Sequence, residues 1–221
     1  MPDRCVVAVD GPSGSGKSTV SRRLATALDG VYLDTGAMYR AVTWAVLEAG
    51  VDPADAESVT KITAETELSV GTDPVAPYIR ANGVDVSGPI RGQQVTGAVS
   101  AVAAVPAVRR QLVALQQAII AEFPRIVVEG RDIASVVAPS ADLKVYLTAS
   151  ERARAERRSA EVLADVSATA ADLARRDRLD SSRTADPLRQ ASDAVELDTT
   201  GMGIDEVVAR LLVLLQARVS S

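Results

Sequence analysis

The sequence has 221 residues and a formal net charge of −5; 47% of its residues are hydrophobic and only 3% are aromatic. This length suits one sizeable α/β domain, and the hydrophobic share is enough for a real core. The acidic balance and the few aromatic side chains argue against a nucleic-acid polymer as partner, because such a partner calls for a broad basic surface or for stacking aromatic rings.

The sequence contains no histidine and a single cysteine, Cys5. A histidine-based catalytic triad, a histidine-ligated zinc and an internal disulfide are therefore excluded. The groups that remain for chemistry are carboxylates, lysine, arginine, backbone amides and Mg²⁺. No apolar run reaches membrane-spanning length and the N-terminus lacks a charged-then-apolar leader, so we expect a cytoplasmic protein that does not bind membranes.

Strands and helices alternate along most of the sequence. The apolar, β-branched run at 4–10 predicts a buried strand, and a helical pattern follows at 17–28. Further strands are predicted at 31–33, 125–129, 143–148 and 194–197, and further helices at 37–48, from 151 onwards, across the alanine-rich 160–174, and at 204–218. This order predicts an α/β fold: a five-stranded parallel sheet between helical layers, with three layers in the order α/β/α.

Residues 67–86 interrupt the alternation with short β-like runs, and the Asn-Gly pair at 82–83 is a strong hairpin signal. We expect a small antiparallel insertion here, which either shapes a binding pocket or only braces it.

The segment "GPSGSGKST" at 11–19 matches G-x-x-x-x-G-K-[ST] between a predicted buried strand and a predicted helix, the context of a phosphate-binding P-loop. Its alternative, a Gly/Ser-rich turn that binds nothing, is disfavoured by those flanks. Backbone N–H groups and Lys17 would face a polyphosphate, and the Ser18 hydroxyl would ligate Mg²⁺. The predicted ATP-binding residues are Gly11, Pro12, Ser13, Gly14, Ser15, Gly16, Lys17, Ser18 and Thr19.

Among P-loop proteins, a GTPase switch needs an N-K-x-D base reader, and the only asparagine here is Asn82 in the predicted turn. The D-x-x-G match at 85–88 lies in the insertion, not after a core strand, and we interpret it as chance. A motor ATPase is usually longer. The class that remains transfers the γ-phosphate to a small acceptor, so a second anion site is expected.

Three further polar motifs follow predicted elements: "DTGAMYR" at 34–40, "EGRD" at 129–132 and "RDRLDSSR" at 176–183. Together with the P-loop, and with "DVSGPIR" at 85–91 and "SAVAAVPAVR" at 100–109, they resemble the cytidylate (CMP) kinase family in its bacterial form. The resemblance spans nearly the whole chain. It implies a P-loop NTPase-like fold and Mg²⁺-assisted transfer of phosphate from ATP to CMP and dCMP.

The resemblance also implies the organisation of the chain, as one nucleoside monophosphate kinase domain over 1–221 that we expect to be a monomer. Its core would comprise 1–34, 106–150 and 190–221, its acceptor-binding region 35–105, and its helical lid 151–189.

The family's substrate-binding residues map onto the matching positions. Thr35 and Arg40 would hold the acceptor phosphate or its surroundings, with Tyr39 beside the nucleotide. Ser100 and Arg109 would contact the cytosine edge. Tyr39 could instead be an ordinary core aromatic, and Ser100 a small helix-packing residue.

The resemblance further implies that Arg131 grips the CMP phosphate and that Asp132 accepts the cytosine 4-amino group. Arg176 and Asp180 would reach the acceptor ribose, and Arg183 the phosphates. The alternatives are a structural Arg131–Asp132 ion pair and a solvated charged helix face for 175–183. Lys17, Arg131, Arg176 and Arg183 are the predicted catalytic residues.

Two acidic residues, Glu129 and Asp10, are candidates to orient Mg²⁺-bound water, although the family commonly has aspartate at the position of Glu129, and Asp10 could be structural instead. Two other functions stay open: a small P-loop kinase for another acceptor, such as UMP or a small alcohol, and a nucleotide-binding regulatory module without catalysis.

Overall fold

The structure is a computed structural model that describes residues 4–162 and 166–219. The parts of the predicted regions at 1–3, 163–165 and 220–221 lie outside the described residues. The chain divides into two compact units: one runs to Tyr32 and resumes at Phe123, and the other is the continuous segment Leu33–Glu122.

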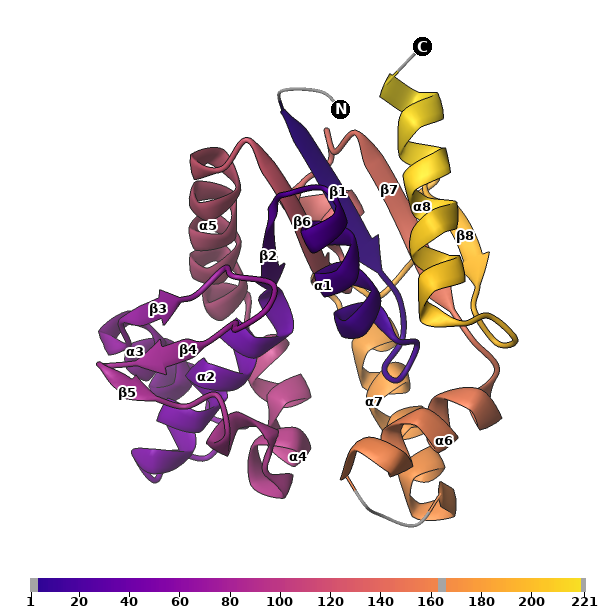
Figure 1. The fold of residues 1–221 in the computed structure, drawn as a ribbon. Coiled ribbons are helices and arrows are strands. Elements are labelled where there is room, and N and C mark those ends of the chain that lie inside the picture. Colours follow the sequence, from indigo (N-terminus) through magenta and orange to yellow (C-terminus); the bar gives the residue numbers. More distant parts are fainter. Residues whose placement is uncertain (1–3, 163–165, 220–221) are drawn as a thin grey trace. The chain divides into compact units, whose positions relative to one another are not determined.

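The main sheet has five strands in the order β2–β6–β1–β7–β8 (Figure 1). Their bounds are β1 (Cys5–Asp10), β2 (Val31–Asp34), β6 (Arg125–Gly130), β7 (Leu143–Thr148) and β8 (Val195–Asp198). β1 is parallel to both β6 and β7, with Val7 opposite Val127 and Leu143, and β7 is parallel to β8. β1 lies inside the sheet and helices cover both faces, so all six of its residues are buried, which explains the apolar run from Cys5 to Val9.

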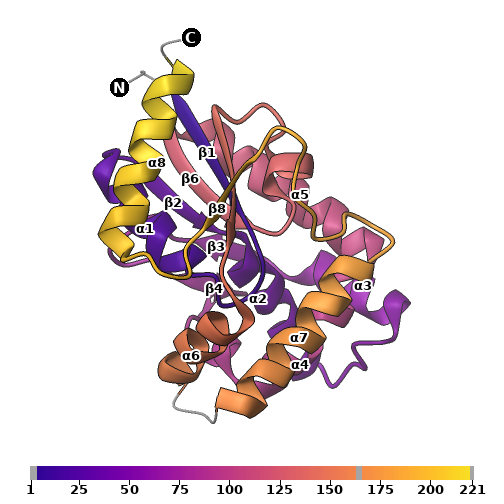
Figure 2. The same ribbon diagram turned by 90° about the vertical axis from the view of Figure 1, so that its right-hand side faces the viewer.

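Helices α1 (Lys17–Ala27) and α8 (Ile204–Val219) cover one face of the sheet, where Val7, Leu24 and Leu211 are fully buried in one core (Figures 1 and 2). Successive strand residues point to opposite faces, so Asp10 points away from this core. Its carboxylate accepts hydrogen bonds from the π-helix η2 (Ile133–Val137). The predicted α/β fold with helices on both sides of a five-stranded parallel sheet is confirmed.

The charged segment after β7 forms two helices within the described residues, α6 (Glu151–Val162) and α7 (Val166–Ser182). The helix predicted from 151 and the helical character predicted for 160–174 are thereby confirmed for the part of the chain that the structure describes. The observed ends of the predicted core elements lie within two residues of the expected ones, and β7 has the predicted bounds.

The second unit contains α2 (Thr35–Glu48), α3 (Ala56–Glu65), α4 (Gln93–Ala103) and α5 (Pro106–Glu122), together with the short helix η1 (Pro89–Arg91). α2 begins two residues before its predicted start because the Asp34 side chain accepts the backbone N–H of Ala37 at 2.9 Å and caps the helix. The predicted acceptor-binding region, 35–105, falls inside this unit.

The predicted insertion is an antiparallel sheet of β3 (Leu68–Val70), β4 (Ile79–Ala81) and β5 (Val84–Asp85). Asn82 and Gly83 join the last two strands with φ values of 50° and 80°, as a type I′ turn requires. The hairpin predicted from this pair is therefore confirmed.

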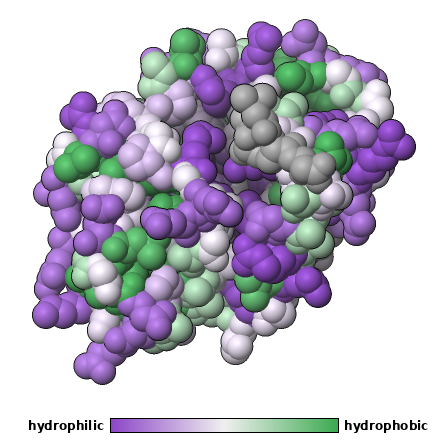
Figure 3. Space-filling view, turned by 90° about the horizontal axis from the view of Figure 1, so that it is seen from below, coloured by the Kyte–Doolittle hydropathy of each residue, from purple (hydrophilic) through white to green (hydrophobic). Residues whose placement is uncertain are grey.

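Within the described ranges, no single helix is both long and apolar enough to cross a membrane; α4 and α5 pass that test only together, and they bend by 97° at their junction. On the face in Figure 3, hydrophilic side chains prevail and hydrophobic ones form small groups between them.

Candidate active site

The P-loop, which leads from the carboxyl end of β1 into α1, depends on glycine at two crowded positions. Gly11 has φ +149°, and a Cβ there would lie 2.0 Å from the carbonyl oxygen of Leu147. Gly14 has φ +77°, and a Cβ there would lie 2.8 Å from the carbonyl oxygen of Arg154. The missing side chains therefore let the loop turn tightly and let the α6 backbone approach it.

Lys17 is buried at the start of α1, and its ammonium group donates to the carbonyl of Pro12 at 2.8 Å. Burial, reinforced by the nearby guanidinium of Arg131, lowers the pKa of Lys17 to about 7. The carboxylates of Glu129, Asp10 and Asp177 act in the opposite direction. A polyanion bound in the loop would stabilise the charged form of this lysine.

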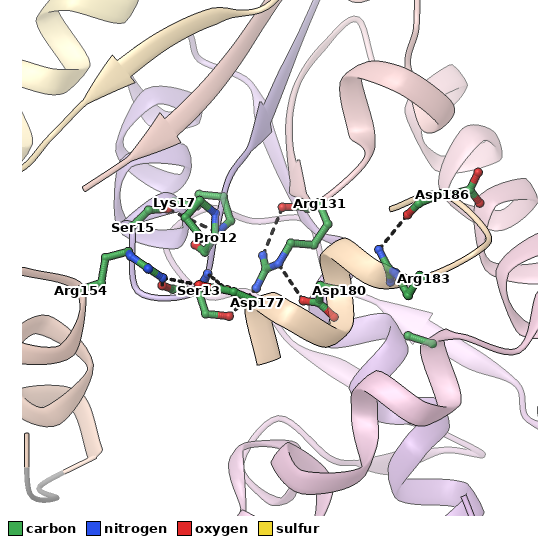
Figure 4. Close-up of polar contacts among 12 residues, drawn as sticks. Pro12, Ser13, Ser15, Lys17, Arg131, Arg154, Asp177, Asp180, Arg183 and Asp186 are labelled. Atoms are coloured by element: carbon green, nitrogen blue, oxygen red, sulfur yellow. Dashed lines mark hydrogen bonds and ion pairs between the residues drawn. The ribbon is translucent and has the colours of Figure 1, made fainter. Parts of the chain in front are cut away.

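Arg131 extends from the carboxyl end of β6 and joins the P-loop to α7. It donates to the Ser13 hydroxyl at 2.7 Å, and its Nε lies 3.2 Å from a carboxylate oxygen of Asp180 (Figure 4). Three motifs that lie far apart in the sequence, "GPSGSGKST", "EGRD" and "RDRLDSSR", thus meet within one unit.

The α7 segment of the charged motif has a buried side. Arg176 and Asp180 are both buried, one and two turns beyond buried Leu173 on the same helix face. Burial, with Arg131 nearby, lowers the pKa of Arg176, and Asp180 opposes that shift. Arg175, in contrast, makes a half-exposed ion pair with Asp172. A solvated helix face therefore accounts for Arg175 but not for the burial of Arg176 and Asp180.

Arg183 and Asp132 complete the predicted set in this unit. Arg183 follows the end of α7 and donates to the carbonyl of Asp186 at 2.9 Å. Asp132 is buried directly after Arg131, next to the start of η2.

Two arginines of α6, Arg154 and Arg157, also contact the P-loop, although the sequence reasoning did not single them out. Arg154 donates to the carbonyl of Ser13 at 3.0 Å and forms an ion pair with Asp177. Arg157 donates to the carbonyls of Ser15 at 3.3 Å and Thr199 at 2.6 Å. α6 has arginines at 152, 154, 157 and 158, and the sequence alone did not indicate which of them reach the loop.

The other predicted acceptor residues lie in the second unit. The Arg109 guanidinium carbon lies 5.4 Å from the centre of the Tyr39 ring, and Arg109 is 2% exposed. Arg40 donates to the carbonyl of Ile90 at 3.0 Å and to the Thr96 hydroxyl at 2.9 Å. Buried Thr35 and Ser100 lie on α2 and α4. This unit therefore brings Tyr39 and Arg109 together and anchors Arg40 to η1 and α4.

The donor set available for Mg²⁺ is small. No group of three or more acidic, cysteine or histidine side chains gathers among the described residues. Both oxygens of Asp10 accept backbone N–H groups, which supports its structural alternative, and Glu129 accepts the Tyr32 hydroxyl at 2.5 Å. The exposed Ser18 hydroxyl supplies one hard oxygen, so the residues fit a Mg²⁺ ion held mainly by phosphate oxygens and water.

A phosphate loop after the central parallel strand, with arginines from the end of β6 and from α6 against it, defines a P-loop protein of the kinase class. The profile of the cytidylate kinase family matches residues 7–217, and the chain belongs to this family.

Named relatives agree with this assignment. A cytidylate kinase of Rhodococcus jostii (strain RHA1) is 54% identical over 97% of this chain and 96% of its own length. One of Nocardia farcinica (strain IFM 10152) is 56% identical over 93% of this chain and 91% of its own. A gluconokinase structure from Sinorhizobium meliloti 1021 has a TM-score of 0.54 at 16% identity, over 98% of this chain and 94% of its own, and shows likeness of fold alone.

Proposed function

We propose that this protein transfers the γ-phosphate of ATP to CMP and dCMP, forming ADP with CDP or dCDP. The observation that carries the proposal is the cation cluster on the P-loop, where Lys17, Arg131 and Arg154 each donate to loop atoms, in a member of the cytidylate kinase family. Phosphoryl transfer relies mainly on alignment and on stabilisation of negative charge, and this cluster supplies both.

The donor triphosphate binds along the loop residues 11–19, with Lys17 at its β- and γ-phosphates. Arg131, Arg176 and Arg183 neutralise charge that develops on the migrating group. The attacking CMP phosphate oxygen is already ionised at neutral pH, so the reaction needs no general base. The sequence contains no histidine, which agrees with a reaction that needs no general base.

The acceptor is recognised at three points. Thr35 and Arg40, with Arg131, hold its phosphate, and Arg176 and Asp180 reach its ribose. Tyr39, Ser100 and Arg109 surround the base, and the Asp132 carboxylate accepts the cytosine 4-amino group. Uracil presents a carbonyl oxygen at that point, so the carboxylate repels it.

The Ser18 hydroxyl would ligate the Mg²⁺ ion that accompanies ATP, and Glu129 would order the water bound to that ion. The ion would neutralise phosphate charge. Residues 151–189, with α6 and α7, act as the lid that carries arginines to the phosphates and excludes water. The protein works as a monomer in pyrimidine nucleotide metabolism of the cytoplasm.

The proposal is tested by measuring ADP release from pure protein and MgATP with CMP, dCMP, UMP or AMP as acceptor. We expect release with CMP and dCMP to exceed release with UMP and AMP by at least about tenfold, the discrimination that one charge-assisted hydrogen bond provides. Preference for another monophosphate would assign a different kinase activity, and no release with any acceptor would support a regulatory module.

A further inference from the structure

The ion pair between Arg154 and Asp177 holds both backbone polar groups of Ser13 in the P-loop (Figure 4). The Ser13 N–H donates to Asp177 at 3.1 Å, and Arg154 donates to the Ser13 carbonyl at 3.0 Å. Arg154 comes from α6 and Asp177 from α7. One ion pair therefore connects the two helices to each other and both to the loop.

The donors that Asp177 uses are of the type that binds phosphate. A backbone N–H of a P-loop and a guanidinium bind carboxylate and phosphate oxygens through the same charge-assisted hydrogen bonds. Asp177 is also close enough to Lys17 to raise the pKa of that lysine. A carboxylate thus lies among donors that a triphosphate would require.

Arg154 retains donor capacity beyond this pair. It is 9% exposed, and its Nε has no hydrogen-bond partner among the residues that the structure describes. A buried guanidinium with an unpaired N–H carries an energetic cost that an additional anionic oxygen would remove.

We propose that Asp177 is an internal competitor of the ATP triphosphate for the Ser13 N–H and for Arg154. Binding of the triphosphate displaces the carboxylate, and the two freed donors then bind phosphate oxygens. This inference rests on the proposed function only in taking ATP as the ligand of the loop. Asp177 accordingly weakens ATP binding while it keeps α6 and α7 attached to the loop.

The test compares the Kd for MgATP of the wild type and of Asp177→Asn by isothermal titration calorimetry without acceptor. Asparagine keeps the shape and a carbonyl acceptor for the Ser13 N–H, but it removes the charge that pairs with Arg154. We expect the Kd to fall about fivefold to tenfold, as for the loss of one competing charge-assisted hydrogen bond. An unchanged or higher Kd would overturn the inference, since a carboxylate that only orders the loop would give that result.

Asp172→Asn is the matched control, because it removes the same charge from the same helix at an ion pair with Arg175 whose side chains are 42% and 40% exposed. Its Kd for MgATP should equal that of the wild type; an equal fall in both variants would assign the effect to net charge and overturn the inference. If Asp177→Asn does not fold, Asp177→Ser is titrated instead under the same criterion. Failure of the proposed function would show separately, as wild-type protein that binds MgATP but releases no ADP with CMP.

Discussion

At the end of β6, two adjacent residues of opposite charge, Arg131 and Asp132, lie near the P-loop unit's charged motifs. Arg131 pairs with Asp180 of α7 and with the Ser13 hydroxyl, while Asp132 is buried beside η2. The sequence alone left open a simple ion pair between the two. Arg131 contacts the loop and α7, and for buried Asp132 we propose the base-specificity role.

Replacing Asp132 tests that role. Asp132→Ala should lower turnover of CMP and reduce the CMP-over-UMP preference by about 5- to 150-fold, because it removes one charge-assisted hydrogen bond to the base. Steady-state assays with both monophosphates measure the preference. If the ratio of kcat/KM values stays as in the wild type, Asp132 does not select the base.

Gly14 is the residue at which the loop and the α6 backbone come closest. Gly14→Ala would place a methyl group near the carbonyl of Arg154 at φ +77°. We expect unfolding free energy to fall by about 1–2 kcal/mol and the KM for ATP to rise, since a left-handed conformation is costly for alanine. Chemical denaturation and kinetics measure the two effects. Gly97→Ala is the control, because no atom lies within 4 Å of its Cβ position; equal effects in both variants would contradict the prediction.

Asp10 provides a pH-dependent prediction. Burial raises the pKa of this carboxyl to about 6, whereas its unfolded value is about 3.9. Between these values the folded protein binds more protons than the unfolded chain, so the contribution of Asp10 to stability decreases as pH rises from about 4 to about 6.

Urea denaturation at several pH values tests this sign, with Asp10→Asn as the comparison. The unfolding free energy of the wild type should decrease relative to that of the variant across the window. Parallel pH profiles of the two proteins would show that Asp10 titrates normally.

At the scale of elements, the sequence patterns predicted the alternation of strands and helices because burial imposes periods of two and 3.6 residues. The charged segment in α7 was harder to interpret. Arg175, Arg176 and Arg178 are alike in local sequence, yet only Arg176 faces the buried side. Which arginine points inward depends on how the helix is rotated about its axis against its neighbours. A run of charged residues does not predict that rotation.

Helix α5 has a polar residue within its buried stripe. Gln116 is 0% exposed, one turn from buried Leu112 and Ile120, and neither amide atom has a hydrogen-bond partner among the described residues. Since unpaired buried amides are costly, Gln116→Met should raise the unfolding free energy by about 1 kcal/mol. Chemical denaturation measures the change, with the exposed Gln117→Met as control. A clear loss of stability would contradict the prediction.

At the scale of the whole molecule, the net charge is negative, but positively charged side chains gather in one of the two units. Acidic residues outnumber basic ones, 29 to 24, yet Lys17, Arg131, Arg154 and Arg176 lie in the unit that holds the P-loop. A local cation cluster in an acidic protein attracts phosphates at short range while the net charge opposes them at long range.

Ionic strength should therefore weaken binding of the acceptor's phosphate and leave binding of its base unchanged. Raising NaCl from about 0.05 M to about 0.5 M shortens the screening length, and we expect the KM for CMP to rise several-fold. Inhibition by cytidine, which lacks the phosphate, should stay unchanged. A KM that is insensitive to salt would show that charge contributes little to acceptor binding.

The sequence by itself determined the parallel sheet, the P-loop and the Asn-Gly hairpin, because each is encoded in neighbouring residues through burial periodicity and permitted φ angles. Only the tertiary structure decided which distant charges meet. Arg154 bonds to the carbonyl of Ser13 although 141 positions separate them in the chain, and Asp177 bonds to the N–H of that same residue. Such contacts follow from the packing of α6 and α7 against the loop. Local sequence does not predict which elements, distant in the chain, pack against one another.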